Sequence, residues 1–200
     1  PATSRAGVAA FTTSTGYGIA KYDNPEELSV SDRNNIGYQY TDCPLYWISV
    51  IYLNFAEAKA EMGSLTQDDL NNSINKLQAR AGLPAMTTTP DADPANNMGV
   101  SNLIWEIRRC RRCELIMDNW YRYWDLIRWH QLDKLDSTKY PNTMLGANVS
   151  NVPDCEEATK NGYIDASDAQ IRTYEAKHYF YPIPTTQLTL NKNMKQNPGW

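Results

Sequence analysis

Residue types and segments that many functions require are scarce in this chain. It contains two His and three Phe among 200 residues, and no apolar run approaches the ~18 residues of a membrane span. The formal net charge of −4 argues against a nucleic-acid surface. No serine elbow, no nucleophile beside a base and no phosphate-cradling glycine loop is present in the sequence. We therefore predict no enzymatic activity and no nucleic-acid partner.

Cysteine is also sparse, with four residues in the chain. Cys110 and Cys113 form a C-x-x-C, but the pair lies inside a predicted helix and not at its start, where the helix dipole would lower a thiol pKa. The other candidate zinc ligands are Cys43, Cys155, His130 and His178, and their spacing is not that of a zinc site. We predict two semi-buried thiols, no metal and no cofactor. Cys43 and Cys155 fit either a disulfide or two free thiols.

The amino terminus lacks the features of a signal peptide. Residues 1–14, PATSRAGVAAFTTS, have neither a basic start nor an apolar h-region. The first residue is Pro1 and not Met, so we expect a processed or truncated part of a longer protein. With 42% hydrophobic and 21% charged residues, the composition is that of a globular chain with a real core.

The segment from Leu103 to Trp129 reads LIWEIRRCRRCELIMDNWYRYWDLIRW and concentrates arginine and tryptophan. Its apolar residues recur at three- and four-residue steps, which is the period of one helix face; they are Leu103, Ile104, Ile107, Leu115 and Ile116. Carboxylates lie at helical distance from arginines in the pairs Glu114 with Arg111, Asp118 with Arg122, and Asp125 with Arg128. We interpret residues 101–130 as an ion-paired structural helix that Ser101 caps. We expect it to break near Asp118, after which Tyr121 to His130 packs back on it.

A helical hairpin is predicted over residues 44–82. Thr41 or Asp42 caps its first helix, Pro44 fits the first turn and Gly63 ends it. The second helix opens at Ser64 or Thr66 and stops at Gly82. The expected apolar stripe of the first helix is Ile48, Ile51, Tyr52, Phe55 and Met62. Two amphipathic helices over roughly 38 residues have the size of a tetratricopeptide-like hairpin, which buries its apolar face by stacking on neighbours.

The remaining segments show no helical period. Gly, Pro and Asn punctuate residues 1–43, 84–100 and 131–200. A short strand fits Ser14 to Tyr22, and Tyr179 to Pro184 is expected to be extended, with a helical turn after it and a turn at the end of the chain. The predicted fold is therefore mainly α: a tetratricopeptide-like helical hairpin scaffold with long irregular loops and little β. Its segments are residues 1–43, 44–82, 101–130 and 131–200.

Three separated segments resemble the SusD/RagB family. LIWEIRRCRRCELIMDNWYRYWDLIRWH is similar to the family's "ERR-x-EL … EG-x-R-x-x-DL-x-RW" segment, and YFYPIPTTQLTLNKNMKQNPGW to its closing "Y-PIP … N-x-x-x-QNPGY" segment. YLNFAEAKAEMG with INKLQARAGLP is similar to "YLNYAEA … IN-x-IR-x-RAGLP". TSTGYGIAKY, residues 13–22, is similar to a segment that precedes the hairpin. The chain departs from the pattern at Cys110, where the family often has Glu, and at Trp200, where it usually has Tyr.

This resemblance implies the carboxy-terminal part of a cell-surface lipoprotein in the outer membrane of a Bacteroidota-type bacterium. Such proteins bind oligosaccharides or polysaccharides, or sometimes peptides, and sit over a SusC-like TonB-dependent transporter. Their contact with the membrane is a lipid anchor, which would lie upstream of this chain. The resemblance thus implies a non-catalytic nutrient-binding protein for carbohydrate uptake.

Aromatic residues with a polar atom are the best candidates for a ligand site. Thirteen Tyr and six Trp outnumber three Phe, and such rings present a face to sugar C–H groups. The tryptophans of the central helix are expected to pack inside the fold. The loop residues Tyr17, Tyr22, Tyr38 and Tyr40 are therefore the predicted ligand-binding residues. The alternative hypothesis is a helical-repeat module for protein–protein interaction with no sugar ligand.

Overall fold

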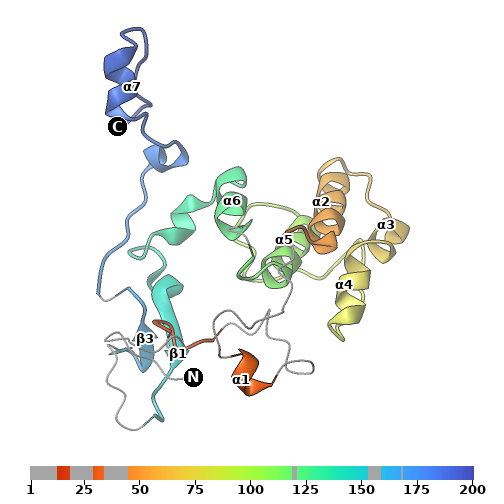
Figure 1. Ribbon diagram of the computed structural model, residues 1–200. Coiled ribbons are helices and arrows are strands. Elements are labelled where there is room, and N and C mark those ends of the chain that lie inside the picture. Colours follow the sequence, from red (N-terminus) through yellow and green to blue (C-terminus); the bar gives the residue numbers. More distant parts are fainter. Residues whose placement is uncertain (1–12, 19–28, 34–44, 119–120, 153–158, 168) are drawn as a thin grey trace. The chain divides into compact units, whose positions relative to one another are not determined.

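The computed structural model describes residues 13–18, 29–33, 45–118, 121–152, 159–167 and 169–200. The chain divides into two compact units, each of which is described by itself. We call Lys21–Arg122 the helical unit, and Pro1–Ala20 with Tyr123–Trp200 the sheet unit. Helices dominate the described residues (Figure 1), which confirms the predicted mainly α fold class.

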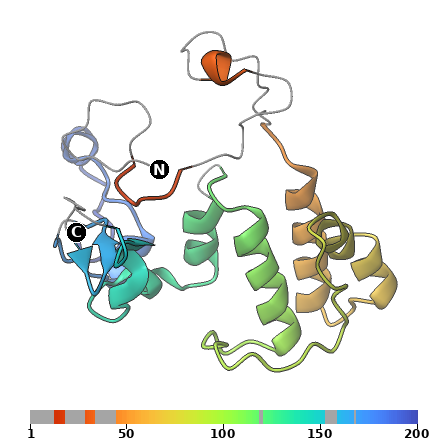
Figure 2. The same cartoon turned by 90° about the horizontal axis from the view of Figure 1, so that it is seen from below.

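The helical unit contains five helices within its described residues. They are α1 (Val30–Arg33), α2 (Ile48–Glu61), α3 (Gln67–Asn71), α4 (Ile74–Arg80) and α5 (Asn102–Glu114). α5 and α4 both pack against α2, and the two views show α5 beside α2 (Figure 1, Figure 2). The predicted hairpin is therefore formed by α2 with α3 and α4, and the central helix packs against it.

The ends of α2 differ in how well local signals predict them. Gly63 follows the helix at φ +66°, a conformation that glycine adopts without strain, so the predicted stop is confirmed. The start lies at Ile48 and not near Pro44, because Trp47 has extended backbone angles and no side chain caps the first turn. The proposed caps Thr41 and Asp42 lie outside the described residues.

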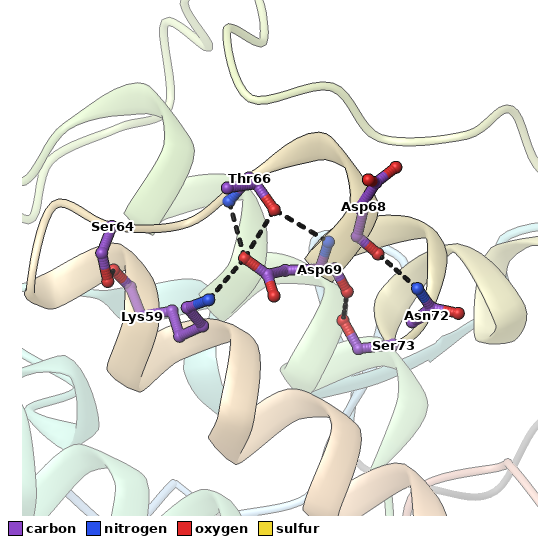
Figure 3. Close-up of polar contacts among 7 residues, drawn as sticks. All are labelled: Lys59, Ser64, Thr66, Asp68, Asp69, Asn72 and Ser73. Atoms are coloured by element: carbon purple, nitrogen blue, oxygen red, sulfur yellow. Dashed lines mark hydrogen bonds and ion pairs between the residues drawn. The ribbon is translucent and has the colours of Figure 1, made fainter.

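A capping box opens α3 (Figure 3). The Thr66 hydroxyl accepts a hydrogen bond from the Asp69 N–H at 3.2 Å, and the Asp69 carboxylate accepts from the Thr66 N–H at 2.9 Å. Lys59 of α2 donates to the same carboxylate at 2.7 Å. The Lys59 hydrogen bond is the main cause that lowers the pKa of Asp69 to about 2. The prediction that Thr66 opens the second helix is thus confirmed, and its cap also ties α3 to α2.

The predicted second helix is two helices, because polar side chains interrupt it after Asn71. Asn72 donates from its side chain to the Asp68 carbonyl at 2.9 Å, and the Ser73 hydroxyl donates to the Asp69 carbonyl at 2.5 Å (Figure 3). Such side-chain bonds compete with the backbone ladder of a helix. The chain turns at Ser73, whose ψ is −98°, and α4 begins at the next residue.

The core of the helical unit lies where α2, α4 and α5 meet. Its buried apolar residues are Leu53, Ala56, Leu70, Ile74, Leu77, Met86, Ile107 and Leu115. The predicted stripe of α2 is wrong in this respect: Ile48, Ile51, Phe55 and Met62 are all exposed. The opposite face is buried because Ala56 and the half-buried Ala60 are small enough to let α4 and α5 approach closely.

A side-chain cap begins α5, and charged side chains join α5 to α2. Ser101 caps α5 as predicted, since its hydroxyl accepts from the Ile104 N–H at 3.3 Å. Arg108 contacts Glu57 and Glu61 of α2 at 3.3 and 3.0 Å. These contacts support the interpretation of this segment as an ion-paired structural helix.

Three further arginine contacts concern the predicted ion pairs. Glu114 accepts two hydrogen bonds at 2.6 Å from Arg80 of α4, while the buried Arg111 donates to Asn54 at 2.8 Å. The pair of Asp125 and Arg128 forms as predicted, at 2.8 Å. The sequence spacing predicts ion pairs within one helix, but several charged residues of this segment contact α2 or α4 instead.

The sheet unit combines short helices with a three-stranded antiparallel sheet. Its elements are α6 (Tyr121–Arg128, which begins two residues before the unit), η1 (Leu132–Leu135), η2 (Pro141–Met144), β1 (Leu145–Asn148), β2 (Thr159–Lys160), β3 (Tyr163–Asp165), η3 (Ala176–Tyr179) and α7 (Thr185–Leu190). The strand order is β1-β3-β2. Leu145 pairs with Asp165, and Lys160 pairs with Tyr163. The strands fall in a segment that was expected to be irregular.

The carboxy-terminal segment follows its prediction except at Tyr179, which was expected to be extended and instead ends η3. Phe180 to Pro184 carries no regular element, and α7 begins at Thr185. Gln196 then pairs with Ile183 through two hydrogen bonds of 2.7 and 2.9 Å. The indole of Trp200 donates to the carbonyls of Lys177 and Phe180, at 3.2 and 2.9 Å. The final turn therefore brings its aromatic residue back onto η3, as the sequence indicates.

Candidate functional site

An open hollow of about 380 Å³ lies beside the sheet of the sheet unit. Its lining comes from η2, from β1 and from the turn and strand that follow β2. The lining residues are Asn142, Leu145, Gly146, Asn161 and Tyr163. η2 runs directly into β1, and β1 pairs with β3, so backbone hydrogen bonds set the positions of these residues. We treat this hollow as the candidate ligand site.

The turn between β2 and β3 places two of the lining side chains. Asn161 and Gly162 have φ values of +55° and +79°, a region that asparagine and glycine adopt at the lowest cost. Two such residues in sequence form the tight turn whose twist matches a hairpin. The Gly162 carbonyl also accepts from the Val149 N–H at 2.8 Å. Asn161 therefore sits at the hairpin tip, and Tyr163 begins β3.

The described part of the amino-terminal segment, which carries Tyr17, lies against β1. The Ala147 N–H donates to the Thr15 carbonyl at 2.8 Å. A Cβ atom added at Gly146 would overlap this carbonyl oxygen and come within 2.9 Å of its carbon, so a glycine is required there. The Thr15 hydroxyl in turn accepts from the Tyr17 N–H at 3.3 Å. Gly146 thus belongs both to the hollow and to the contact that positions the Tyr17 segment.

The predicted ligand-binding residues are only partly covered by the structure. Tyr17 is 63% exposed, and its hydroxyl makes no hydrogen bond to a described residue. Tyr22, Tyr38 and Tyr40 lie outside the described residues. The grouping of these four tyrosines into one site therefore stays a prediction. The described segment at residues 13–18 forms a turn and not a strand.

The lining of the hollow contains polar side chains and no charged one. Tyr163 leaves 38% of its surface exposed. The amides of Asn142 and Asn161 make no hydrogen bond to any residue that the structure describes. An aromatic ring beside free amides can pack against sugar C–H groups while the amides bond hydroxyl groups. The absence of charge among the lining residues favours a neutral polar ligand over an ionic one.

Asp165 of β3 is the carboxylate closest in sequence to the lining, and hydrogen bonds from the turn after β3 hold it. Asp165 accepts from the Ser167 hydroxyl at 2.6 Å and from the Ser167 and Ala169 N–H groups at 3.0 and 3.2 Å. The Ser167 hydroxyl is the main cause that lowers the pKa of Asp165. A carboxylate whose acidity is raised in this way suits a structural role more than proton transfer at neutral pH.

A second carboxylate, that of the buried Asp136, ties together the chain before and after the sheet. Asp136 accepts from Thr138, through its N–H at 2.9 Å and its hydroxyl at 2.5 Å, and from the Tyr174 N–H at 3.1 Å. These bonds, the Thr138 hydroxyl foremost, lower the pKa of Asp136 to about 2. The Ser137 N–H also donates to the Arg172 carbonyl at 2.9 Å. Asp136 therefore supports the site by fixing both ends of the sheet segment.

Both histidines are engaged in packing. The His130 ring lies 4.8 Å from the ring of Tyr179, and His178 accepts from the Glu175 N–H at 3.0 Å through Nδ1. Within the described residues, no group of three or more His, Cys, Asp or Glu could hold a metal ion. No helix among those residues has the length and apolar content to cross a membrane.

The two thiols of the C-x-x-C differ in their surroundings. Cys110 is half-buried, and burial raises its pKa to about 12. Cys113 is exposed, so the prediction of two semi-buried thiols is wrong for this residue. A thiol of raised pKa is a poor nucleophile at neutral pH, and this argues against redox chemistry at the pair.

The residues that line the hollow were not among the predicted ligand contacts. One signal in the sequence could have found the turn that carries them. Asn161-Gly162 is the dipeptide most typical of a two-residue hairpin, and the β-prone pair Tyr163-Ile164 follows it directly. The hollow itself has no local signal, because it depends on the pairing of β1 with β3.

The chain is similar to one protein family and to several solved structures. A model of the SusD family matches residues 1–200. Two solved structures of the protein BT4246 match with a TM-score of 0.53 each, at 23% and 28% identity, over 78% and 80% of this chain. A SusD-like protein from Bacteroides fragilis matches 76% of the chain at 25% identity and a TM-score of 0.49. This chain spans only 23% to 25% of the length of these proteins. No match was found among curated proteins.

Proposed function

This chain belongs to the SusD family, and from this premise we propose that it is part of a cell-surface protein that captures glycans for a TonB-dependent transporter. The observation that carries the proposal is the match of the family model to residues 1–200. Proteins of the SusD family are non-catalytic binding proteins. The proposal therefore involves binding and transfer of an oligosaccharide or polysaccharide, without a reaction.

The wider context belongs to the same proposal. The match covers only 23% and 25% of the two BT4246 chains, so the proposed transporter partner and membrane anchor are properties of the whole protein and not of this chain alone. We propose that the chain is its carboxy-terminal part, that the partner is a SusC-like transporter, and that a lipid anchor upstream holds the protein at the outer membrane.

Within the chain, we propose that the glycan binds at the hollow beside the sheet. The partly exposed ring of Tyr163 offers a stacking face, and the free amides of Asn142 and Asn161 offer donors and acceptors for hydroxyl groups. Tyr17 belongs to the same proposal because its segment contacts Gly146, which lines the hollow. One ring and a few polar contacts suit an affinity in the micromolar to millimolar range, about −8 to −4 kcal/mol.

Tyr22, Tyr38 and Tyr40 remain proposed contacts on the ground of the sequence. They share with Tyr17 a loop-rich segment with no helical stripe to bury them. Substitution of each by Ala, compared with Tyr17→Ala, tests whether the four act at one site. If they do, we expect each substitution to weaken binding of the same oligosaccharide.

Calorimetric titration with a panel of neutral plant and host oligosaccharides tests the proposal. Loss of a ring contact is worth about 1 kcal/mol, so we expect Tyr163→Ala to weaken binding about fivefold. Tyr46→Ala is the matched control, because Tyr46 is 91% exposed and lies in the helical unit. The affinity of this variant for the oligosaccharide should equal that of the unchanged chain. Circular dichroism of both variants checks that the fold persists. Failure of every oligosaccharide to bind would contradict the proposed function.

The alternative function is a helical-repeat module that binds another protein. A specific observation favours it: α2 leaves Ile48, Ile51 and Phe55 exposed by 64%, 60% and 43% on the face away from the core. Apolar patches of this kind often mark protein contacts. The two functions separate in one experiment, since a charge placed by Ile51→Asp should leave oligosaccharide binding unchanged but prevent a protein from docking on α2.

A further inference from the structure

We propose that the helical unit carries a second ligand site, which binds a short neutral saccharide without aromatic stacking. The ligand class rests on the proposed function, but the site itself rests on a separate hollow of about 450 Å³. That volume falls within the usual range for ligand pockets. Its lining comes from Gln78 of α4, from the loop that follows α4, and from Glu106 and Arg109 of α5.

The loop that forms one wall is held in place by side-chain amides of α3 and α4 and by a backbone hydrogen bond. Asn75 of α4 accepts from the Met86 N–H at 2.7 Å and donates to the Met86 carbonyl at 3.1 Å. Gln67 of α3 donates to the same carbonyl at 3.0 Å. The Leu83 N–H donates to the Gln78 carbonyl at 2.9 Å. With Met86 itself buried, this wall is preformed, so a ligand would bind without ordering the loop.

Gln78 provides the observation that points to a ligand. Only 7% of the residue is exposed, yet its side chain lines the hollow. Its Nε2 donates only to the sulfur of Cys110, at 3.9 Å, and its Oε1 accepts no hydrogen bond from a described residue. Sulfur is a weak acceptor, so the Gln78 amide keeps hydrogen-bonding capacity that no strong protein partner uses. A ligand hydroxyl can satisfy both ends of this amide, because it donates and accepts.

The charged groups of the lining select against an anion. Arg109 donates from Nε to Glu106 at 2.7 Å, and this bond raises the pKa of the guanidinium. Asp91 adds a second carboxylate to the lining, so its formal charge is negative. No cation of the lining is left over for a carboxylate or phosphate ligand. Planar amide, guanidinium and carboxylate groups match pairs of neighbouring hydroxyls, which is the chemistry of a neutral sugar.

The absence of aromatic residues from this lining distinguishes it from the hollow of the sheet unit. Leu83, Pro84 and Pro90 supply the apolar surface instead. Binding should therefore depend on hydrogen bonds to Gln78, Asp91 and the Arg109 pair. The two hollows should respond to different substitutions, and this makes the inference testable apart from the proposed function.

The test follows the Arg109 Nε–H resonance by ¹H–¹⁵N NMR while maltotriose, cellotriose, xylotriose or mannotriose is added. Arg109→Lys assigns the resonance by its loss. We expect at least one neutral trisaccharide to shift it saturably. Gln78→Leu, which removes the amide at similar size, should weaken this response about 5- to 10-fold. Asp91→Ala, at an exposed loop position, should weaken it without risk to folding.

The controls separate the inference from the proposed function. Asp68→Ala changes an exposed aspartate elsewhere in the helical unit and should leave the response unchanged. Tyr163→Ala should also leave it unchanged, because that residue lines the other hollow. Trigalacturonate should bind more weakly than the neutral sugars.

Several results would overturn the inference. An Arg109 response that Gln78→Leu and Asp91→Ala both leave intact would remove the site. Saccharide binding that Tyr163→Ala abolishes while the Arg109 resonance never moves would do the same, and the proposed function would stand. Tighter binding of trigalacturonate would refute the ligand class. If no saccharide binds to either hollow, both the inference and the proposed function are wrong.

Discussion

The packing of α5 on α2 makes a quantitative prediction about two isoleucines. Ile107 of α5 is fully buried, whereas Ile51 of α2 is 60% exposed. Both lie within helices of the helical unit, so Ile→Ala is the same chemical change at the two positions. The comparison separates the burial of a side chain from its effect on helix propensity.

The expected cost at Ile107 is large. Removal of three carbons loses about 2.4 kcal/mol at ~0.8 kcal/mol per buried methylene, and the cavity left behind adds to this. The better helix propensity of Ala recovers at most about 0.7 kcal/mol. We therefore expect Ile107→Ala to lower the free energy of unfolding by about 3 kcal/mol. At Ile51 the small loss of burial and the gain in propensity nearly cancel, so the change should stay within about 0.5 kcal/mol.

Urea unfolding followed by circular dichroism at the helix band measures both effects. With an m-value of about 2 kcal/mol/M, Ile107→Ala should lower the midpoint by about 1.5 M, while Ile51→Ala should leave it in place. An unchanged midpoint for Ile107→Ala would refute the packing of α5 in the core. A loss at Ile51 as large as at Ile107 would show that the outer face of α2 is covered, and the case for a protein-binding surface there would disappear.

Three further predictions concern pH, thiol reactivity and backbone conformation. Hydrogen bonds hold the native pKa of Asp136 at about 2, whereas the pKa of an unfolded Asp is about 3.9. The stabilisation by Asp136 is therefore complete above about pH 3.9 and is lost as the pH falls toward 2. The difference in melting temperature between the chain and Asp136→Asn should shrink between pH 5 and 2, and a constant difference would contradict this. At pH 8 a maleimide should label Cys113 well before Cys110, whose raised pKa leaves a thiolate fraction of about 1 in 10⁴; peptide mapping by mass spectrometry measures the order, and equal rates would be evidence against burial of Cys110. Gly162→Ala should destabilise the hairpin by about 1–2 kcal/mol because of its positive φ, while Gly18→Ala, which meets no neighbour, should not; hydrogen exchange of the strand amides reports the difference.

Local signals in the sequence predict most of the helical unit. Thr66 and Ser101 accept the N–H groups that a cap must satisfy, and Gly63 takes the positive φ that ends a helix. These features depend on residues within one turn of one another. The break at Ser73 was missed because Ser and Asn are tolerated inside helices, and only the bonds they form decide the outcome.

The face that α2 buries was harder to predict than the helix itself. Apolar residues occur on more than one side of α2, so periodicity alone favoured the larger side chains at Ile48, Ile51 and Phe55. The structure instead buries Leu53 and Ala56 with a serine and a glutamate. The reason lies in the partners: Arg108 of α5 meets Glu57, and small side chains allow the close approach that this contact needs.

The candidate site was the least predictable part, and the reason is physical. Its residues lie in or next to strands of two to four residues, which are too short to show an alternating pattern. Gly146 reads as a loop breaker in the sequence, but its missing side chain is what allows the Thr15 carbonyl to approach β1. A glycine that serves a close approach cannot be told from one that serves a turn until its partner is known. Gly146→Ala should therefore weaken glycan binding even though it removes no polar group, because it displaces the segment that carries Tyr17.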